Sequence, residues 1–374
     1  MSGHFSSLLA TDQPGHARVP VTVLTGFLGS GKTTLLNALL REPDLQGTAV
    51  IVNEFGAIGI DHDLIAHTTE DTILLANGCM CCAVRGDLIG ALVRLGERQA
   101  ADGSALRQVL IETSGLADPA PILRTVMGGP AVKERFTLAS VCCTVDAVLA
   151  LGTLDRHPEA SRQIAMADHL FLTKTDLLGG PVPQELLGRI SGLNPTGTVH
   201  QQREQHAAVL RQMMQARAND ARSAPAENGL FYRPVSAIGD TATGDTGTPP
   251  PHADGITSFV IVRDDPLPRD GFYAWLDMVI AMRGEDLLRV KGIVSLQEQP
   301  ERPLVFHGVQ HLYQPPVSLP AWPSEDRRTR IVFITRGVDA EAMDESLRVF
   351  ARRRRPRPAA AASPDLSSQP KETP

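Results

Sequence analysis

The chain has 374 residues, 42% of them hydrophobic, and a formal net charge of −6 at pH 7. This length can bury one large core and a second, smaller one. The negative charge argues against general nucleic-acid binding, and no apolar run is long enough to predict a membrane-spanning helix. The first residues lack the basic start and apolar stretch of a secretory signal, so we expect a cytoplasmic protein whose five cysteines are reduced.

Short apolar runs alternate with amphipathic segments over residues 19–218, after an N-terminus at 1–18 that we expect to be flexible. The runs read, in chain order, VTVLT, TAVIVN, TILLAN, QVLIETSG, LASVCCTVDAV and DHLFLTKTD. Segments with helical periodicity lie between them, among them TLLNALL, GDLIGALVRLGERQA and ASRQIAMA. Nearly continuous apolar strands separated by helices predict an α/β domain with a mostly parallel sheet covered by helices on both faces.

The composition changes at residues 219–255, where IGDTATGDTGTPPPHADG predicts a linker because it is rich in Gly, Thr and Pro. Beyond it, ITSFVIVRDD, LLRVKGIVSL, RPLVFHGVQHLY and RTRIVFITRG predict strands, and RDGFYAWLDMVIAMRG and AEAMDESLRVFARR predict helices. These segments indicate a smaller α+β domain at residues 256–354. We expect a disordered tail at 355–374 and interpret the Arg cluster just before it as a solvated segment.

The segment GFLGSGKTT fits the phosphate-binding pattern G-x-x-x-x-G-K-[ST]. It lies between an apolar run and a predicted helix, where backbone N–H groups and the helix dipole can surround phosphate oxygens. The larger domain is therefore expected to be a P-loop NTPase domain, with Lys32 neutralising the β- and γ-phosphates and the Thr33 hydroxyl binding Mg²⁺. The expected nucleotide contacts of this segment are Gly26, Gly29, Ser30, Gly31, Lys32, Thr33 and Thr34.

The segment LTKTD ends a later apolar run of the same predicted sheet. A carboxylate at this position can accept both N1–H and the N2 amino group of guanine, a pattern that adenine does not offer. Asp176 is the candidate reader of the base, and the apolar stem of Lys174 can lie along base and ribose. GTP is favoured over ATP, and an ATP-dependent kinase-like enzyme is the less favoured alternative.

Two further segments carry acidic residues beside glycines. In IETSGLADP, Glu112 is expected to orient the Mg²⁺ shell, and the backbone N–H of Gly115 to meet the γ-phosphate. In NEFGAIGID, Glu54 and Asp61 lie on a loop that we expect to order around Mg²⁺ and the γ-phosphate and to relax after hydrolysis. A solvated loop with ordinary acidic residues is the alternative for this second segment.

The segment NGCMCC places Cys79, Cys81 and Cys82 too close together for a disulfide, although their thiolates can converge from a turn. Three thiolates suit Zn²⁺ or Cu⁺, and a site with three protein ligands leaves a fourth position for exchange. The residues point to a metal site built for transfer. A buried turn of small residues, a redox pair and a structural zinc site remain open as alternatives.

Other candidate ligands have simpler interpretations. Cys142 and Cys143 lie within an apolar run, where cysteine packs as a small hydrophobic residue, so we expect both in the core. His307 and His311 flank GVQ in a predicted strand pair, and we expect them to be ordinary half-buried histidines.

Taken in chain order, GFLGSGKTT, NEFGAIGID, NGCMCCAVRGDL, ETSGLADP and TKTD resemble the CobW-type P-loop GTPases. This family of metallochaperone and metal-insertion GTPases includes zinc-transfer and cobalamin-biosynthesis proteins. The segments LLRVKGIVSL, FHGVQHLY and RIVFITRG resemble its C-terminal domain more loosely. Two features depart from the pattern: Thr173 stands where many members have the Asn that ties the base-binding loop to the phosphate loop, and the linker has His252 in place of a His-rich tract.

The resemblance implies a GTPase that converts GTP to GDP and phosphate, with a slow intrinsic rate. It implies that Cys79, Cys81 and Cys82 bind the cargo, Zn²⁺ or a similar divalent metal, which passes to a client metalloprotein under nucleotide control. GTP, Mg²⁺ and Zn²⁺ are the expected ligands. The alternative is a GTP-switched regulatory or assembly protein with structural zinc. The client, the choice among zinc, cobalt and iron, and the oligomeric state are left open by the sequence.

Overall fold

The computed structural model of the chain describes residues 18–42, 45, 47–54, 72–76, 83–102, 106–215 and 255–352. Nearly all of the predicted N-terminal segment, linker and tail lie outside these residues, as do Asp61, Cys79, Cys81 and Cys82. The exact domain boundaries therefore stay predictions. None of the described helices is long and apolar enough to cross a membrane.

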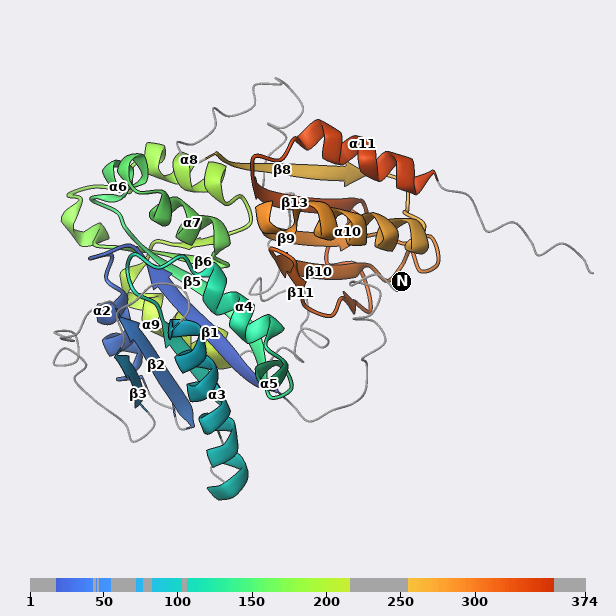
Figure 1. The fold of residues 1–374 in the computed structure, drawn as a ribbon. Coiled ribbons are helices and arrows are strands. Elements are labelled where there is room, and N and C mark those ends of the chain that lie inside the picture. The colour runs from blue at the N-terminus through green and yellow to red at the C-terminus, as the bar shows by residue number, and fades with distance from the viewer. Residues whose placement is uncertain are drawn as a thin grey trace, which may run out of the picture.

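Seven parallel strands form the larger sheet, in the order β3-β2-β4-β1-β5-β6-β7 (Figure 1). Strands β1, β4 and β6 are buried along their whole length, which is why their sequences read as continuous apolar runs. The predicted parallel fold is confirmed. The strands span Val19–Gly26 (β1), Thr48–Glu54 (β2), Thr72–Ala76 (β3), Gln108–Glu112 (β4), Phe136–Asp146 (β5), His169–Thr173 (β6) and Thr198–His200 (β7).

Helices cover both faces of this sheet. On one face, α2 and α9 pack over one apolar cluster, and on the other face α3, α4, α7 and α8 pack over a larger one (Figure 1). The helices and short 3₁₀ turns span Lys32–Leu39 (α2), Ala83–Asp102 (α3), Ala120–Gly128 (α4), Pro130–Lys133 (α5), Ala150–Arg156 (α6), Pro158–Met166 (α7), Thr175–Leu177 (η3), Gln184–Leu193 (α8), Arg203–Gln205 (η4) and His206–Gln215 (α9).

The two adjacent core cysteines belong to different faces of the sheet. Cys142 packs in the cluster under α2 and α9, and Cys143 packs in the cluster on the other side. Both are buried, and burial raises the pKa of the Cys143 thiol to about 12. The prediction that they pack as hydrophobic residues is confirmed.

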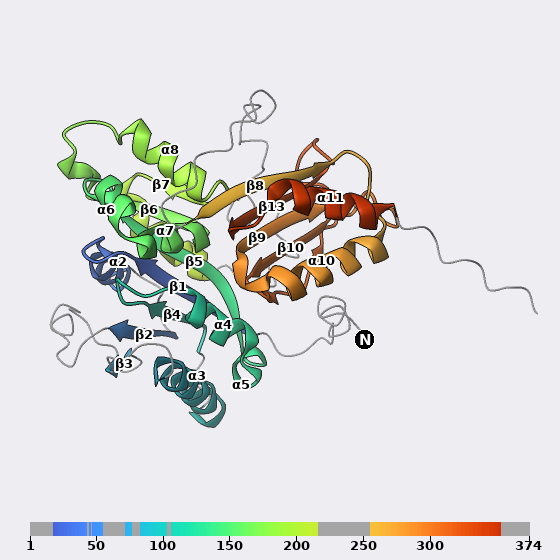
Figure 2. The same cartoon turned by 45° about the horizontal axis from the view of Figure 1, so that its top comes forward.

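The smaller sheet is antiparallel, with β11-β10-β9-β13-β8 as its main order and β12 beside β10. Helices α10 and α11 pack against each other and cover one of its faces (Figures 1 and 2). Its elements span Ile256–Arg263 (β8), Arg269–Arg283 (α10), Gly284–Asp286 (η9), Leu287–Val294 (β9), Leu304–Val309 (β10), Leu312–Tyr313 (β11), Val317–Ser318 (β12), Thr329–Arg336 (β13) and Ala340–Ala351 (α11).

The two histidines of this sheet have different surroundings. His307 is half-buried in β10, as predicted, and its Nε2 lies 2.6 Å from Gln314 Oε1. Burial, with the nearby charge of Arg289, lowers its pKa to about 4. The same prediction is wrong for His311, which is exposed because it follows the turn at Gln310, where φ is +54°.

The other face of the antiparallel sheet packs against the parallel-sheet domain. Ile256, Leu288, Val309 and Ile334 belong to the same apolar cluster as the residues between the parallel sheet and its helices. Polar contacts also cross the boundary: Gln314 Nε2 donates to the Leu138 carbonyl at 2.6 Å. The two sheets therefore share one continuous core.

Asp168 carries the main charged contact between the two sheets. Its carboxylate pairs with the Arg289 guanidinium and with Lys291 Nζ at 2.8 Å, and it accepts a hydrogen bond from the Val141 N–H at 2.9 Å. Burial alone would raise the pKa of Asp168, but the two positive charges hold it well below its usual range. The carboxylate is therefore ionised and fully engaged.

A β-bulge in β9 brings both cations to this carboxylate. Consecutive residues of β13 pair with Leu287 and Arg289, so Leu288 is an extra residue in β9. Beyond the bulge, alternation places Arg289 and Lys291 on one face. Both reach Asp168, which lies between α7 and β6.

We expect Asp168→Asn to lower the free energy of unfolding by about 3 kcal/mol, because it leaves two largely buried cations without their counter-charge. The measurement is urea unfolding of the full-length protein. Glu301→Gln is the matched control, because Glu301 pairs with Arg327 at 2.7 Å on the open surface and should change stability by less than about 1 kcal/mol. Equal losses in the two variants would contradict a special role for Asp168.

Candidate nucleotide-binding site

The phosphate loop between β1 and α2 needs its glycines for stereochemical reasons. Gly26, Gly29 and Gly31 have φ values of +142°, +70° and +92°, which L residues with side chains rarely adopt. A Cβ on Gly26 would also lie 2.3 Å from Thr144 Oγ1. Thr144 holds the loop as well, since its hydroxyl lies 2.7 Å from the Ser30 hydroxyl. The loop is therefore fixed against β5.

Lys32 begins α2 and points back into the phosphate loop. Its side chain is largely buried, and Nζ donates to the carbonyl oxygens of Gly26 at 3.0 Å and Phe27 at 3.2 Å. These contacts place a positive charge at the centre of the loop, where phosphate oxygens would be held. Thr34, the other residue of this turn in the predicted set, is exposed.

Thr33 and Glu112 meet across the site although they are far apart in the sequence. Thr33 Oγ1 donates to Glu112 Oε1 at 3.2 Å, and Glu112 is buried at the carboxyl end of β4. A hydroxyl and a carboxylate are the hard oxygen groups that Mg²⁺ prefers. The pair therefore fits a Mg²⁺ bound by Thr33 and oriented through Glu112.

Gly115 lies directly against the phosphate loop. A Cβ on Gly115 would stand 2.8 Å from both the N and the Cα of Leu28, so only glycine allows this approach. The Gly115 carbonyl accepts a hydrogen bond from Gln163 Nε2 at 3.1 Å. The arrangement brings the segment after β4 beside the turn expected to hold the γ-phosphate.

Thr173 ties the predicted base-binding segment to the phosphate loop. Its hydroxyl donates to the Ser30 carbonyl at 2.7 Å and lies 3.3 Å from the Val145 carbonyl. The tie that an Asn provides in many related proteins is therefore made here by a threonine hydroxyl. A hydroxyl has one donor, so it holds the loop but offers no amide N–H to a base.

Lys174 and Asp176 stand at the rim of the same edge. Lys174 has a φ of +58°, and its Nζ pairs with Asp146 Oδ2 at 2.6 Å. Asp146 also accepts backbone hydrogen bonds from Val148 and Leu149, which fixes the loop after β5. Asp176 is half exposed and pairs with Arg203 at 2.8 Å.

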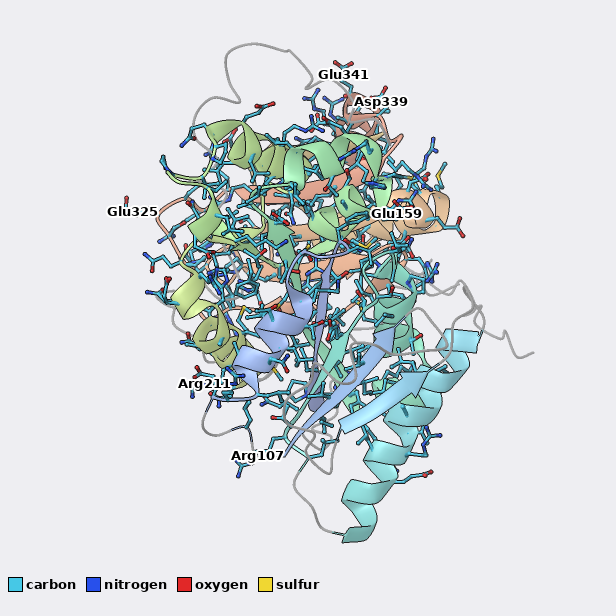
Figure 3. All side chains as sticks on the ribbon, turned by 90° about the vertical axis from the view of Figure 1, so that its left-hand side faces the viewer. Arg107, Glu159, Arg211, Glu325, Asp339 and Glu341 are labelled. Carbon is cyan, nitrogen blue, oxygen red and sulfur yellow. The ribbon has the colours of Figure 1, made fainter. Side chains whose placement is uncertain are left out.

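Sequence reasoning missed several partners in this site: Thr144, Asp146, Gln163 and Arg203. Two of them could have been found from the sequence, because functional residues gather at the carboxyl ends of parallel strands. Asp146 is the last residue of β5, and Arg203 lies shortly beyond the end of the short strand β7. Thr144 and Gln163 carried no such signal, since a threonine in a strand and a glutamine in a helix are ordinary. Figure 3 faces the edge of the molecule on which these loops lie, with Glu159 of α7 labelled on it.

The remaining predicted ligands lie at the β3 end of the sheet or outside the described residues. Glu54 ends β2 and pairs in register with Ala76, the last residue of β3. The chain that continues from Ala76 contains Cys79, Cys81 and Cys82, so it leaves the sheet beside Glu54. Among the described residues, no group of three or more His, Cys, Asp or Glu side chains could hold a metal ion.

A parallel sheet with this phosphate loop and a β4 carboxylate beside it defines a P-loop nucleotide-binding protein. Residues 20–201 match the family CobW/HypB/UreG, nucleotide-binding domain, and residues 256–351 match the cobalamin synthesis protein cobW C-terminal domain. The chain belongs to the CobW/HypB/UreG family and is a GTPase.

Several named proteins are similar to most or to part of the chain. The zinc chaperone YjiA of Escherichia coli is 32% identical over 317 residues, which cover 84% of this chain and 93% of that protein. The zinc chaperone CobW of Pseudomonas aeruginosa is 30% identical over 364 residues, covering 89% and 91%. The Zinc-regulated GTPase metalloprotein activator 1 of Schizosaccharomyces pombe is 35% identical over 167 residues, covering 43% and 40%.

The fold is also that of a solved relative. The crystal structure of Zn(II)-bound YjiA GTPase from E. coli superposes with a TM-score of 0.63 at 25% sequence identity, covering 90% of this chain and 99% of that one. A Zn(II)-bound YjiA variant in which a glutamate and two cysteines are replaced by alanine gives the same TM-score at 26% identity. The YjiA structure therefore matches both domains of this chain.

We expect Thr173→Val to weaken guanine-nucleotide binding by about tenfold, because it removes the tie and leaves the buried Ser30 carbonyl without this donor. The measurement is a titration with a fluorescent GDP derivative. Thr173→Ser keeps the hydroxyl and is the control, with an expected change of less than about threefold. Equal weakening in both variants would show that the methyl packing, and not the hydrogen bond, holds the loop.

Proposed function

We propose that the protein is a cytoplasmic GTP-hydrolysing metallochaperone that delivers Zn²⁺, or a similar divalent metal, to a client metalloprotein. The cargo site is Cys79, Cys81 and Cys82. One observation supports this proposal above others: the register of β2 and β3 starts the cysteine-bearing segment on the same sheet edge as the phosphate loop. The names of the relatives support zinc as the cargo.

The nucleotide roles follow from the side chains along this edge. When GTP binds, Lys32 Nζ leaves the carbonyl oxygens of Gly26 and Phe27 and donates to the β- and γ-phosphate oxygens. Its positive charge reduces the repulsion between the negatively charged phosphates. Thr33 and Glu112 would hold and orient Mg²⁺, and the bound ion would supply positive charge to the separating phosphate. The N–H of Gly115 meets the γ-phosphate. A water then attacks the γ-phosphorus, the bond to the bridging oxygen breaks, and GDP and phosphate result.

The base is read at the opposite end of the edge. Asp176 accepts the N1–H and N2 amino donors of guanine, and Lys174 extends along the base from its contact with Asp146. Arg203 holds the Asp176 carboxylate in the free protein and leaves its other lone pairs available. Guanine is selected over adenine because adenine would leave the carboxylate facing a ring nitrogen that has no proton.

Hydrolysis is coupled to cargo through the loop that begins at Glu54. With GTP, Glu54 and Asp61 order around Mg²⁺ and the γ-phosphate, and the neighbouring cysteine segment is held in one arrangement. Loss of the γ-phosphate releases this loop and changes the affinity for metal. Three thiolates leave a coordination position for a ligand from the client, which allows transfer without a free ion.

We expect Zn²⁺ affinity to differ between a non-hydrolysable GTP analogue and GDP, both with Mg²⁺, by at least about fivefold, the low end of allosteric coupling. The measurement is competition with a chromophoric chelator. Combined Cys79→Ser, Cys81→Ser and Cys82→Ser should abolish this binding.

Cys143→Ala is the control for loss of a thiol, because Cys143 is buried in the core. Zinc that binds equally tightly with both nucleotides would instead support a GTP-switched assembly protein with structural zinc.

We expect Asp176→Asn to move the preference from guanine toward xanthine nucleotides. The Asn amide can donate to the C2 oxygen of xanthine, whereas it faces the N2 amino group of guanine with a second donor. The switch in relative affinity should be about 100-fold or more, as for buried hydrogen-bond mismatches. It is measured by competition of GTP and XTP against a fluorescent GDP derivative.

Arg203→Met is the matched variant, because it breaks the ion pair with Asp176 but keeps the carboxylate. It should retain the preference for guanine. If both variants prefer GTP equally, Asp176 does not read the base.

A further inference from the structure

Helix α7 connects the nucleotide edge to the antiparallel sheet. It runs from Pro158 to Met166, and the residue after its cap is Asp168, which is bound by Arg289 and Lys291 of β9. Helix α7 also packs directly against β9. The middle of α7 reaches the segment after β4, so one short helix contacts both the nucleotide edge and the antiparallel sheet.

Gln163 makes the contact with the segment after β4. The side chain is completely buried, and its Nε2 donates to the carbonyl oxygens of Gly115 at 3.1 Å and Ala117 at 3.0 Å. Arg162 adds an ion pair with Asp118 at 3.7 Å. Two carbonyls of the segment that lies against the phosphate loop are therefore held by one amide group.

The same amide is left unsatisfied on its other side. Gln163 Oε1 is buried and has no hydrogen-bond partner among the described residues. A buried acceptor without a donor raises the free energy of this arrangement. A shift of the segment 115–117 that turned one of its N–H groups toward Oε1 would remove that penalty and so stabilise a second arrangement of the segment.

The C-terminal turn of α7 cannot move independently of β9 and α8. Asn194 Nδ2 donates to the carbonyls of Ile164 and Ala167, both at 2.7 Å, which ties the last turn of α7 to α8. Separating Asp168 from its two cations would leave charges buried without partners. A displacement of α7 is therefore passed to β9 rather than absorbed between them.

We propose that Gln163 is a positioning residue that transmits the presence of the γ-phosphate from Gly115 through α7 and Asp168 to β9. The C-terminal domain then takes up a nucleotide-dependent position, and it presents a different surface to the client in the GTP and GDP states. This inference rests on the proposed binding of GTP beside Gly115.

The test is hydrogen exchange of the full-length protein with a GTP analogue and with GDP, both with Mg²⁺. In the native protein we expect peptides from β9, Leu287–Val294, to exchange differently in the two states. In Gln163→Met this difference should vanish, while nucleotide protection of the phosphate loop remains. Lys291→Met, at the far end of the path, should lose the response of β9 but keep the response of α7.

Gln108→Met is the matched control. Gln108 is also a buried glutamine whose Nε2 donates one hydrogen bond, to Thr48 Oγ1 at 2.7 Å, but it lies at the start of β4 away from Gly115. It should leave the β9 response intact. In steady-state assays Gln163→Met should lower kcat for GTP hydrolysis about tenfold with KM changed less than threefold, because the lost contacts position the γ-phosphate segment and not the base.

Two results would overturn the inference and separate it from the proposed function. The coupling is wrong and the nucleotide site stands if the phosphate loop responds to nucleotide but β9 does not. The same conclusion holds if β9 responds in Gln163→Met as strongly as in the native protein. If neither nucleotide protects the phosphate loop of the native protein, the nucleotide site and the coupling that rests on it are both wrong.

Discussion

Seven parallel strands end at one edge of one sheet, and this constraint determines where chemistry can occur in the molecule. Because every neighbour in the sheet is parallel, the segments after β1, β4, β5 and β6 emerge side by side. Residues more than a hundred positions apart, such as Ser30 and Thr173, consequently meet within hydrogen-bond distance. The phosphate loop lies at the centre of the sheet, where β1 is flanked by β4 on one side and β5 on the other.

The order of the strands also separates the predicted base-binding, phosphate-binding and cysteine-bearing segments along that edge. The segment with Lys174 and Asp176 follows β6, the phosphate loop follows β1 beside β4, and the chain that leads to Cys79, Cys81 and Cys82 follows β3 at the opposite end. In the proposed function, a nucleotide along this edge would extend its γ-phosphate toward β4 and β2. The γ-phosphate would then be the part of the nucleotide that influences the cysteines, and the base would mainly contribute affinity.

Local sequence was sufficient where a function depends on consecutive residues. The spacing of the phosphate loop, the apolar strands and the acidic residue at the end of β4 were all readable. The contacts that close the site were not, because Thr144 and Gln163 reach it from other elements, and nothing in their own segments marks them. The same limit applied to the domain interface: a bulge at Leu288 decides which face Arg289 and Lys291 take, and alternation alone does not reveal a bulge. The prediction for His311 was wrong for a related reason, since β10 ends at Val309 and the turn at Gln310 places His311 outside the strand.

The predicted base-binding half of the edge shares its supports with the C-terminal domain. Helices α7 and α8 belong to the same apolar cluster as β6, and they contact β9 and β8, respectively. Asp168, at the start of β6, closes this connection with a buried charge that is fully engaged. Removing either cation would be costly, whereas the cysteine-bearing end has no such support among the described residues. In the proposed function, this support at the base-binding end would let binding energy from the base be retained while the contacts to the γ-phosphate change.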